Sequence, residues 1–174
     1  MNCVLHFLEK QEDISIVENN YDRLYPIVKD QFLFSFLPNQ FPNRNFIQIF
    51  CKKLEQTDIS YSKYLFLYQV NRFIQSKNYK RLIYIESNML LKNELGLSDL
   101  INEVNAFGPD FIRFTKNDEI YESFFIGRVS LLDSNLDYAN CSYETYSQRQ
   151  QYNSYDVYTN TPFIKTLDIE RYVS

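Results

Sequence analysis

Three polar residues, Glu86, Ser87 and Asn88, directly follow the apolar run Leu82–Ile85. This run is the clearest strand pattern in the chain, and open α/β sheets bind ligands where their strands end. A carboxylate and an amide oxygen two residues apart could hold a divalent cation or accept a hydrogen bond from a ribose hydroxyl. A polar strand end and a turn or cap residue are the alternatives for Glu86 and Asn88, and both stay open.

A second set of candidate residues lies in an acidic stretch between two predicted strands, at Asn117, Asp118, Glu119 and Glu122. A carboxylate in such a place could act as a general base and take the proton from an acceptor hydroxyl. Asp118 and Glu122 are therefore the candidate catalytic residues. The alternative is a solvated hairpin turn.

Two arginines on the neighbouring predicted strands, Arg113 and Arg128, could bind a phosphate group or pair with acidic side chains. His6 is the only histidine and lies within the apolar run Cys3–Leu8, which predicts a packed core residue. A Ser or Cys triad therefore lacks a second histidine to act as its base. A structural zinc site lacks ligands too, because the sequence contains no Cys-x-x-Cys pair.

Strand and helix patterns alternate along the chain and would position these residues. This alternation predicts an α/β fold with a mostly parallel or mixed sheet and helices on both faces. We expect a single compact domain with its core at about 2–132 and a Tyr-rich covering segment at about 133–174, the end of which could return as a short element. The predicted strands are 3–8, 32–37, 46–51, 82–85, 110–115 and 123–129, and the predicted helices are 13–24, 58–76 and 98–108.

The composition excludes several classes of function. The chain has 174 residues, with 15 Tyr, 15 Phe and no Trp but only 3 Gly, which leaves no room for a phosphate-binding glycine loop. A formal charge of -4 without a basic stripe argues against nucleic-acid binding. No apolar run approaches the roughly 18 residues that span a bilayer, and residues 1–10 do not read as a secretory signal. We therefore expect a cytoplasmic protein without a membrane span.

The segment Tyr79–Leu91 resembles the core of nucleotide-sugar glycosyltransferases of the GT-A fold. In that family an apolar strand ends in an Asp-x-Asp motif and follows a helix of the kind predicted at 58–76. The resemblance rests on this one motif, covers about the first three quarters of the chain, and implies a GT-A, Rossmann-like fold. It further implies that Glu86 and Asn88 lie near a bound Mn²⁺ or Mg²⁺ that neutralises the leaving diphosphate.

The motif departs from the family pattern, because Glu86 stands at the first Asp and the uncharged Asn88 at the second. We therefore expect a glycosyltransferase-like domain that binds a nucleotide sugar through Glu86, Ser87, Asn88, Arg113 and Arg128, with its transferase activity altered or lost. The alternative is a non-catalytic interaction, inhibitor or assembly module. Such a module would contact a protein partner, or a second copy of itself, through its Tyr-rich segment.

Overall fold

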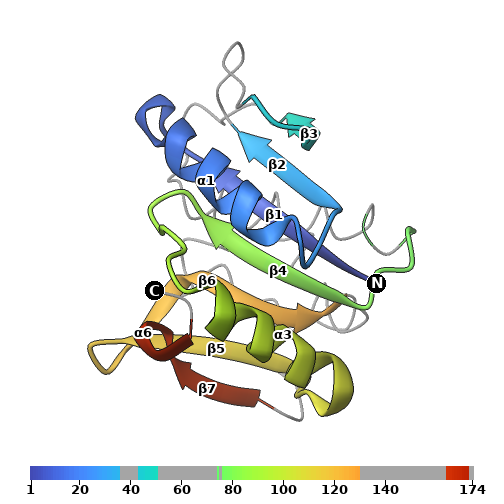
Figure 1. The fold of residues 1–174 in the computed structure, drawn as a ribbon, viewed down its shortest axis with the longest axis vertical. Helices are drawn as coiled ribbons and strands as arrows, with labels where there is room; N and C mark the ends of the chain where they lie inside the picture. Colours follow the sequence, from blue (N-terminus) through green and yellow to red (C-terminus); the bar gives the residue numbers. More distant parts are fainter. Residues whose placement is uncertain (36–42, 51–73, 75, 130–163, 173–174) are drawn as a thin grey trace, which may run out of the picture.

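A mixed β-sheet forms the centre of the structure (Figure 1). The computed structural model describes residues 1–35, 43–50, 74, 76–129 and 164–172. Within these ranges the strand order is β3-β2-β1-β4-β6-β5-β7. The strands β3, β2, β1 and β4 are parallel, β6 is antiparallel to both β4 and β5, and β7 is parallel to β5. The strands are β1 (Asn2–Leu8), β2 (Gln31–Ser35), β3 (Ile47–Phe50), β4 (Arg81–Glu86), β5 (Phe111–Lys116), β6 (Glu119–Arg128) and β7 (Ile164–Asp168).

The two longer described helices lie against one face of this sheet, as Figure 1 shows. The predicted α/β class with a mixed sheet is therefore confirmed. The helix predicted at 58–76 lies outside the described residues, apart from positions 74 and 76. The described helices are η1 (Gln11–Asp13), α1 (Ile14–Leu24), α3 (Glu94–Phe107) and α6 (Ile169–Tyr172).

Helix α1 is amphipathic, and its buried residues Val17, Tyr21 and Leu24 follow one another at spacings of four and three. The helix ends at Leu24, two residues before Pro26. Tyr25 still has helical φ and ψ values, but Pro26 has no backbone N–H to donate the next helical hydrogen bond, so the regular helix stops here. Both predicted ends of this helix are confirmed.

Helix α3 begins at Glu94, four residues before the predicted start at Ser98. The side chain of Asn93 caps it by accepting a hydrogen bond from the backbone N–H of Gly96 at 2.9 Å. At its other end the chain turns away at Gly108, where a β-carbon would lie only 2.3 Å from the carbonyl oxygen of Val104. Glycine is therefore required at this tight exit from the helix.

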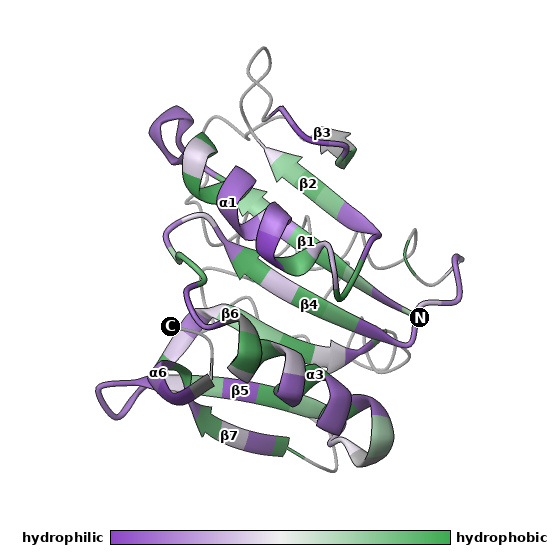
Figure 2. Ribbon diagram, in the orientation of Figure 1, coloured by the Kyte–Doolittle hydropathy of each residue, from purple (hydrophilic) through white to green (hydrophobic). Residues whose placement is uncertain are grey.

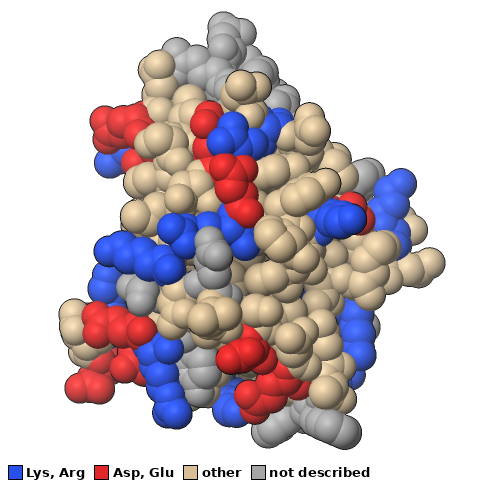
Figure 3. Space-filling view, viewed as in Figure 1, with Lys and Arg blue, Asp and Glu red and all other residues tan. Residues whose placement is uncertain are grey.

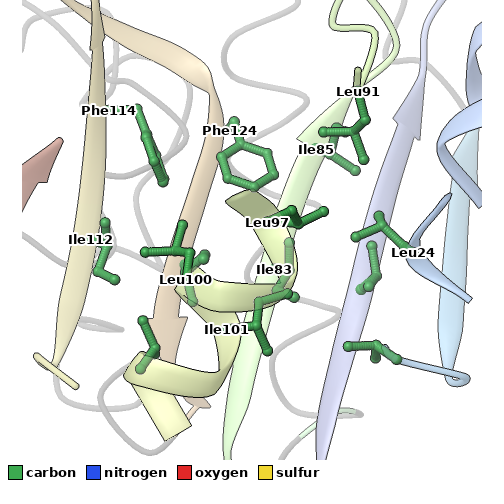
Figure 4. Packing of buried hydrophobic residues seen from close by; sticks show 14 of the residues in the cluster. Leu24, Ile83, Ile85, Leu91, Leu97, Leu100, Ile101, Ile112, Phe114 and Phe124 are labelled. Carbon is green, nitrogen blue, oxygen red and sulfur yellow. The ribbon is translucent and has the colours of Figure 1, made fainter. Parts of the chain in front are cut away.

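The main hydrophobic core lies between α3 and the sheet, and Figure 4 shows Leu97, Leu100 and Ile101 pointing towards the strands. Every side chain of this cluster is less than about one tenth exposed, so its burial supplies the principal driving force for docking the helix. The strand residues that meet α3 are Ile83 and Ile85 of β4, Ile112 and Phe114 of β5, and Phe124 and Ile126 of β6.

The opposite face of the sheet carries aromatic rings in contact with one another. Tyr84 stacks on Phe125 with ring centres 4.7 Å apart, and Phe7 meets Phe34 at 5.0 Å. Phe111 approaches Phe125 edge to face at 5.6 Å. Much of the unusual Phe content therefore lies in the sheet, where large rings fill the space between strands.

His6 is a core residue, as predicted, with only 1% of its surface exposed. Its Nε2 lies 2.6 Å from the amide oxygen of Gln31. Burial lowers the pKa of His6 to about 4, although the hydrogen bond to Gln31 acts in the opposite direction. The ring is therefore neutral near pH 7.

Candidate functional site

The carboxyl ends of β1 and β4 lie side by side, because the two strands are parallel and Phe7 pairs with Glu86. The backbone N–H of Ser87 continues this pairing by donating to the carbonyl oxygen of Phe7 at 2.9 Å. The hydroxyl of Ser87 then donates to Oδ2 of Asp13 at 3.1 Å. Asp13 directly precedes α1, so this contact joins the end of β4 to the start of that helix.

Glu86 is buried at the last position of β4, with 7% of its surface exposed. Oε1 accepts a hydrogen bond from the hydroxyl of Tyr84 at 2.7 Å, and Oε2 accepts one from the hydroxyl of Ser123 at 3.0 Å. Burying a carboxylate is costly unless hydrogen bonds replace its water shell, and these two hydroxyls do so. The bond to Ser123 joins β4 to β6, whereas the bond to Tyr84 lies within β4.

Tyr121 lies near the Glu86 carboxylate and near Ser123, and both groups influence its pKa. Burial raises the pKa of Tyr121; the Ser123 hydroxyl opposes this effect and the charge of Glu86 adds to it. The Nζ atom of Lys116 lies 5.5 Å from the centre of the Tyr121 ring. Tyr121 thus lies near both the buried carboxylate and a cation at the end of β5.

Asn88 is exposed and lies in the loop that connects β4 to α3. This loop is held by the side chain of Asn20 on α1, which is 1% exposed. Nδ2 of Asn20 donates to the carbonyl oxygen of Met89 at 2.6 Å, and Oδ1 accepts from the N–H of Leu91 at 2.9 Å. The amide side chain of Asn20 therefore supplies the hydrogen bonds that a neighbouring strand or helix would otherwise provide to these two backbone groups, and it holds the loop against α1.

A small hollow of about 130 Å³ opens beside Asn88, between the β4–α3 loop and the hairpin of β5 and β6. Both polar and apolar side chains line it. The two lysines among them come from different elements, Lys92 from the loop and Lys116 from β5. The lining residues are Asn88, Met89, Leu90, Lys92, Lys116, Tyr121 and Ile169.

Asp118 lies in the two-residue turn that joins β5 to β6, where Asn117 and Asp118 have φ values of 54° and 63°. Two successive positive φ angles are typical of the tight turn that matches the twist of a β-hairpin. Figure 2 shows this hairpin end as hydrophilic. Glu122 is exposed on β6, next to Ser123 in the sequence. The catalytic role of both carboxylates stays a prediction, and the turn places Asp118 beyond the end of β6, away from Glu86.

Arg128 lies at the other end of β6, opposite Arg81 and about 17 Å along β4 from Glu86, at roughly 3.3 Å per residue. Its Nε lies 3.1 Å from Oδ1 of Asp110. It is therefore an ion-pairing residue outside the Glu86 region, and the structure does not bring the two together. Arg113 donates instead to the hydroxyl of Thr166 on β7, at 2.8 Å.

The predicted metal pair diverges in its surroundings, because Glu86 is buried among hydroxyls whereas Asn88 is exposed. In the part of the chain that the structure describes, no three His, Cys, Asp or Glu side chains gather as a metal site would require.

The Tyr-rich stretch from Tyr138 to Tyr158 lies outside the described residues. The sequence did not identify the hydroxyls of Tyr84 and Ser123 as partners of Glu86. The only local signal was the i, i+2 spacing of Tyr84 and Glu86, which places both side chains on the same face of β4.

No family model matches the sequence, and no curated protein matches it. Solved structures share its fold. The "putative glucose-1-phosphate thymidylyltransferase" from Bacillus anthracis, in complex with a sucrose, aligns with a TM-score of 0.60 and 6% identity over 97% of this chain and 87% of that chain. The "putative protein (Aq1419)" from Aquifex aeolicus VF5 aligns with a TM-score of 0.56 and 10% identity over 95% and 86%.

The chain has a Rossmann-like, nucleotidyltransferase-like α/β fold. At such low identity the likeness concerns the fold alone. The expected GT-A glycosyltransferase type is not shown, since the first of these structures is named as a thymidylyltransferase, and its likeness to this chain is one of fold. Among the described helices, none is long and apolar enough to cross a membrane.

Proposed function

We propose that this chain binds a nucleotide sugar at the carboxyl ends of β1 and β4, with the diphosphate beside Ser87 and Asn88. The observation that carries the proposal is the buried carboxylate of Glu86 at the last position of β4, held by two hydroxyls, with the exposed Asn88 two residues further on. In open α/β sheets this edge is where ligands bind.

The fold supports this assignment, because a structure with a similar fold is named as a glucose-1-phosphate thymidylyltransferase. Within the proposed site, Glu86 has a positioning role, because it fixes the hydroxyls of Tyr84 and Ser123. Asn88 is exposed at the edge where a ligand can reach it, whereas Ser87 is buried beside it with its hydroxyl bonded to Asp13. The GT-A type of site and the altered or lost transferase activity belong to the proposal, with Asp118 and Glu122 as the candidate bases.

Thermal unfolding of the full chain with a panel of nucleoside diphosphates and their sugars, each with and without Mn²⁺, tests the proposal. A ligand at 100 times its Kd stabilises the native state by about 2.7 kcal/mol, which raises Tm by several degrees in a chain of this size. We expect at least one member of the panel to produce this shift.

The variant Asn88→Ala should weaken that binding about tenfold, which corresponds to the loss of one hydrogen bond. Asn102→Ala is the matched control, because Asn102 is also an exposed asparagine but lies on α3. If no nucleotide or nucleotide sugar shifts the transition at millimolar concentration, the proposed function is wrong. Equal effects of the two variants would place binding elsewhere.

A further inference from the structure

Two lysines line the hollow beside Asn88: Lys92, in the β4–α3 loop, and Lys116, the last residue of β5. Both are exposed, and among the described residues neither forms an ion pair with a carboxylate. Figure 3 shows Lys and Arg side chains gathered over the β4–α3 loop, on the left of that view, with acidic side chains below them around the β5–β6 hairpin. The hollow therefore lies at the basic part of this face.

The two predicted metal ligands, Glu86 and Asn88, are poorly arranged to hold a divalent cation. Both oxygens of Glu86 accept hydrogen bonds from protein hydroxyls, and Asn88 contributes no charge. Mg²⁺ and Mn²⁺ prefer charged oxygen ligands that are free to coordinate them. A bound diphosphate would then need its charge balanced by some other group at this edge.

The walls of the hollow are fixed before any ligand arrives. Asn20 holds the loop that carries Asn88 and Lys92 through two hydrogen bonds to its backbone. The half-buried ring of Tyr121 forms the opposite wall under Lys116. A fixed backbone lowers the entropy cost of binding, because fewer groups have to be ordered.

We propose that Lys92 and Lys116 bind the diphosphate of the ligand directly, so that two ammonium groups take the place of a divalent cation. This inference rests on the proposed function. The volume of about 130 Å³ corresponds to roughly four water molecules, which suits a phosphate group but not a whole nucleotide sugar. The nucleoside and the sugar would therefore lie outside the hollow, along the edge formed by Ser87 and Asn88.

Calorimetric titration of the full chain with sodium pyrophosphate and with uridine diphosphate, first in EDTA and then in Mn²⁺, tests this inference. We expect both to bind in EDTA, with an affinity that falls as the salt concentration rises. Lys92→Gln and Lys116→Gln should each weaken binding about tenfold. Lys29→Gln removes the same charge from an exposed position near the other end of the sheet and should have no effect. Lys→Arg at either position should retain most of the affinity.

The outcomes separate this inference from the proposed function. Nucleotide binding that requires Mn²⁺ and is unaffected by Lys92→Gln and Lys116→Gln would overturn the role of the lysines and leave the proposed function intact. Lysine-dependent binding of pyrophosphate in EDTA, with no tighter binding of any member of the nucleotide panel, would support the phosphate site and contradict nucleotide-sugar binding. Absence of binding by both probes would overturn the role of the lysines, and the thermal shifts with the nucleotide panel would then decide the proposed function. The thermal transition of each unliganded variant establishes that it is folded.

Discussion

The single histidine of the chain should make folding stability depend on pH in a way that can be assigned to one residue. The amide nitrogen of Gln31 donates to the carbonyl oxygens of Tyr21 and Val28, at 3.0 and 3.3 Å. Its amide oxygen must therefore accept the hydrogen bond from Nε2 of His6, which carries the ring proton. Nε2 already bears its proton, so acid must protonate Nδ1 inside the core.

The magnitude follows from the difference in pKa between the two states. Burial lowers the pKa of His6 from 6.5 to about 4 in the folded chain, so the unfolded chain binds more protons between these values. The stabilising contribution is complete above pH 6.5, is lost as the pH falls towards 4, and changes no further below that. Linkage gives a loss of about 2 kcal/mol between pH 7 and pH 5, and about 3 kcal/mol by pH 4.

Urea unfolding of the wild-type chain and of His6→Gln at pH 7 and pH 5 measures this contribution. The glutamine side chain can place an amide N–H near the position of Nε2 but does not titrate. The wild-type free energy of unfolding should therefore fall by about 2 kcal/mol more than that of the variant. Ionisation of the carboxylates affects both proteins and cancels in the difference.

Proton NMR provides an independent measurement, because the ring protons of a single histidine give resonances without overlap from another. Their titration midpoint should lie near pH 4. A midpoint near 6.5, or the same pH dependence in wild type and His6→Gln, would refute the reasoning.

Three further predictions concern stability. Asn20→Ala removes both hydrogen bonds to the β4–α3 loop and should cost about 2–4 kcal/mol in urea unfolding; a loss below about 0.5 kcal/mol would mean that water replaces the amide. Gly108→Ala forces a β-carbon against the backbone of Val104 and should lower stability by about 1–3 kcal/mol, whereas an unchanged Tm would show that the helix exit relaxes freely. Asp110→Asn takes the carboxylate from Arg128 and should destabilise the chain by about 0.5–1 kcal/mol; an equal loss at high salt would argue against an electrostatic cause.

Much of the element pattern was predictable, because the strands are runs of apolar residues bounded by polar ones. The run at Leu82–Ile85 became β4, and the spacing of Val17, Tyr21 and Leu24 predicted α1 up to its end before Pro26. The predicted start of α3 at Ser98 was too late by four residues. The helix begins at Glu94, because the side chain of Asn93 caps the N–H of Gly96. Strand β6 begins four residues earlier than predicted, since its first turn-proximal residues are exposed.

The strand order and the surroundings of Glu86 could not be predicted, because both depend on contacts between distant parts of the sequence. Ser123 reaches Glu86 only because β6 pairs antiparallel with β4, and no local pattern specifies that pairing. For the same reason Arg128 was grouped with the candidate site, although the pairing with β4 places it at the opposite end of that strand. The position of Glu86, Ser87 and Asn88 at the end of a strand was a local property, and it was predicted correctly.

The hydrogen bonds of Asn20 have a consequence for motion as well as for structure. The amide proton of Leu91 is held by a side chain of α1 and not by its own loop, so its exchange with solvent deuterium requires the helix to move. We therefore expect the loop and the part of α1 that carries Asn20 to open together. A ligand that binds to the loop would slow hydrogen exchange along the buried face of α1, at residues it never touches.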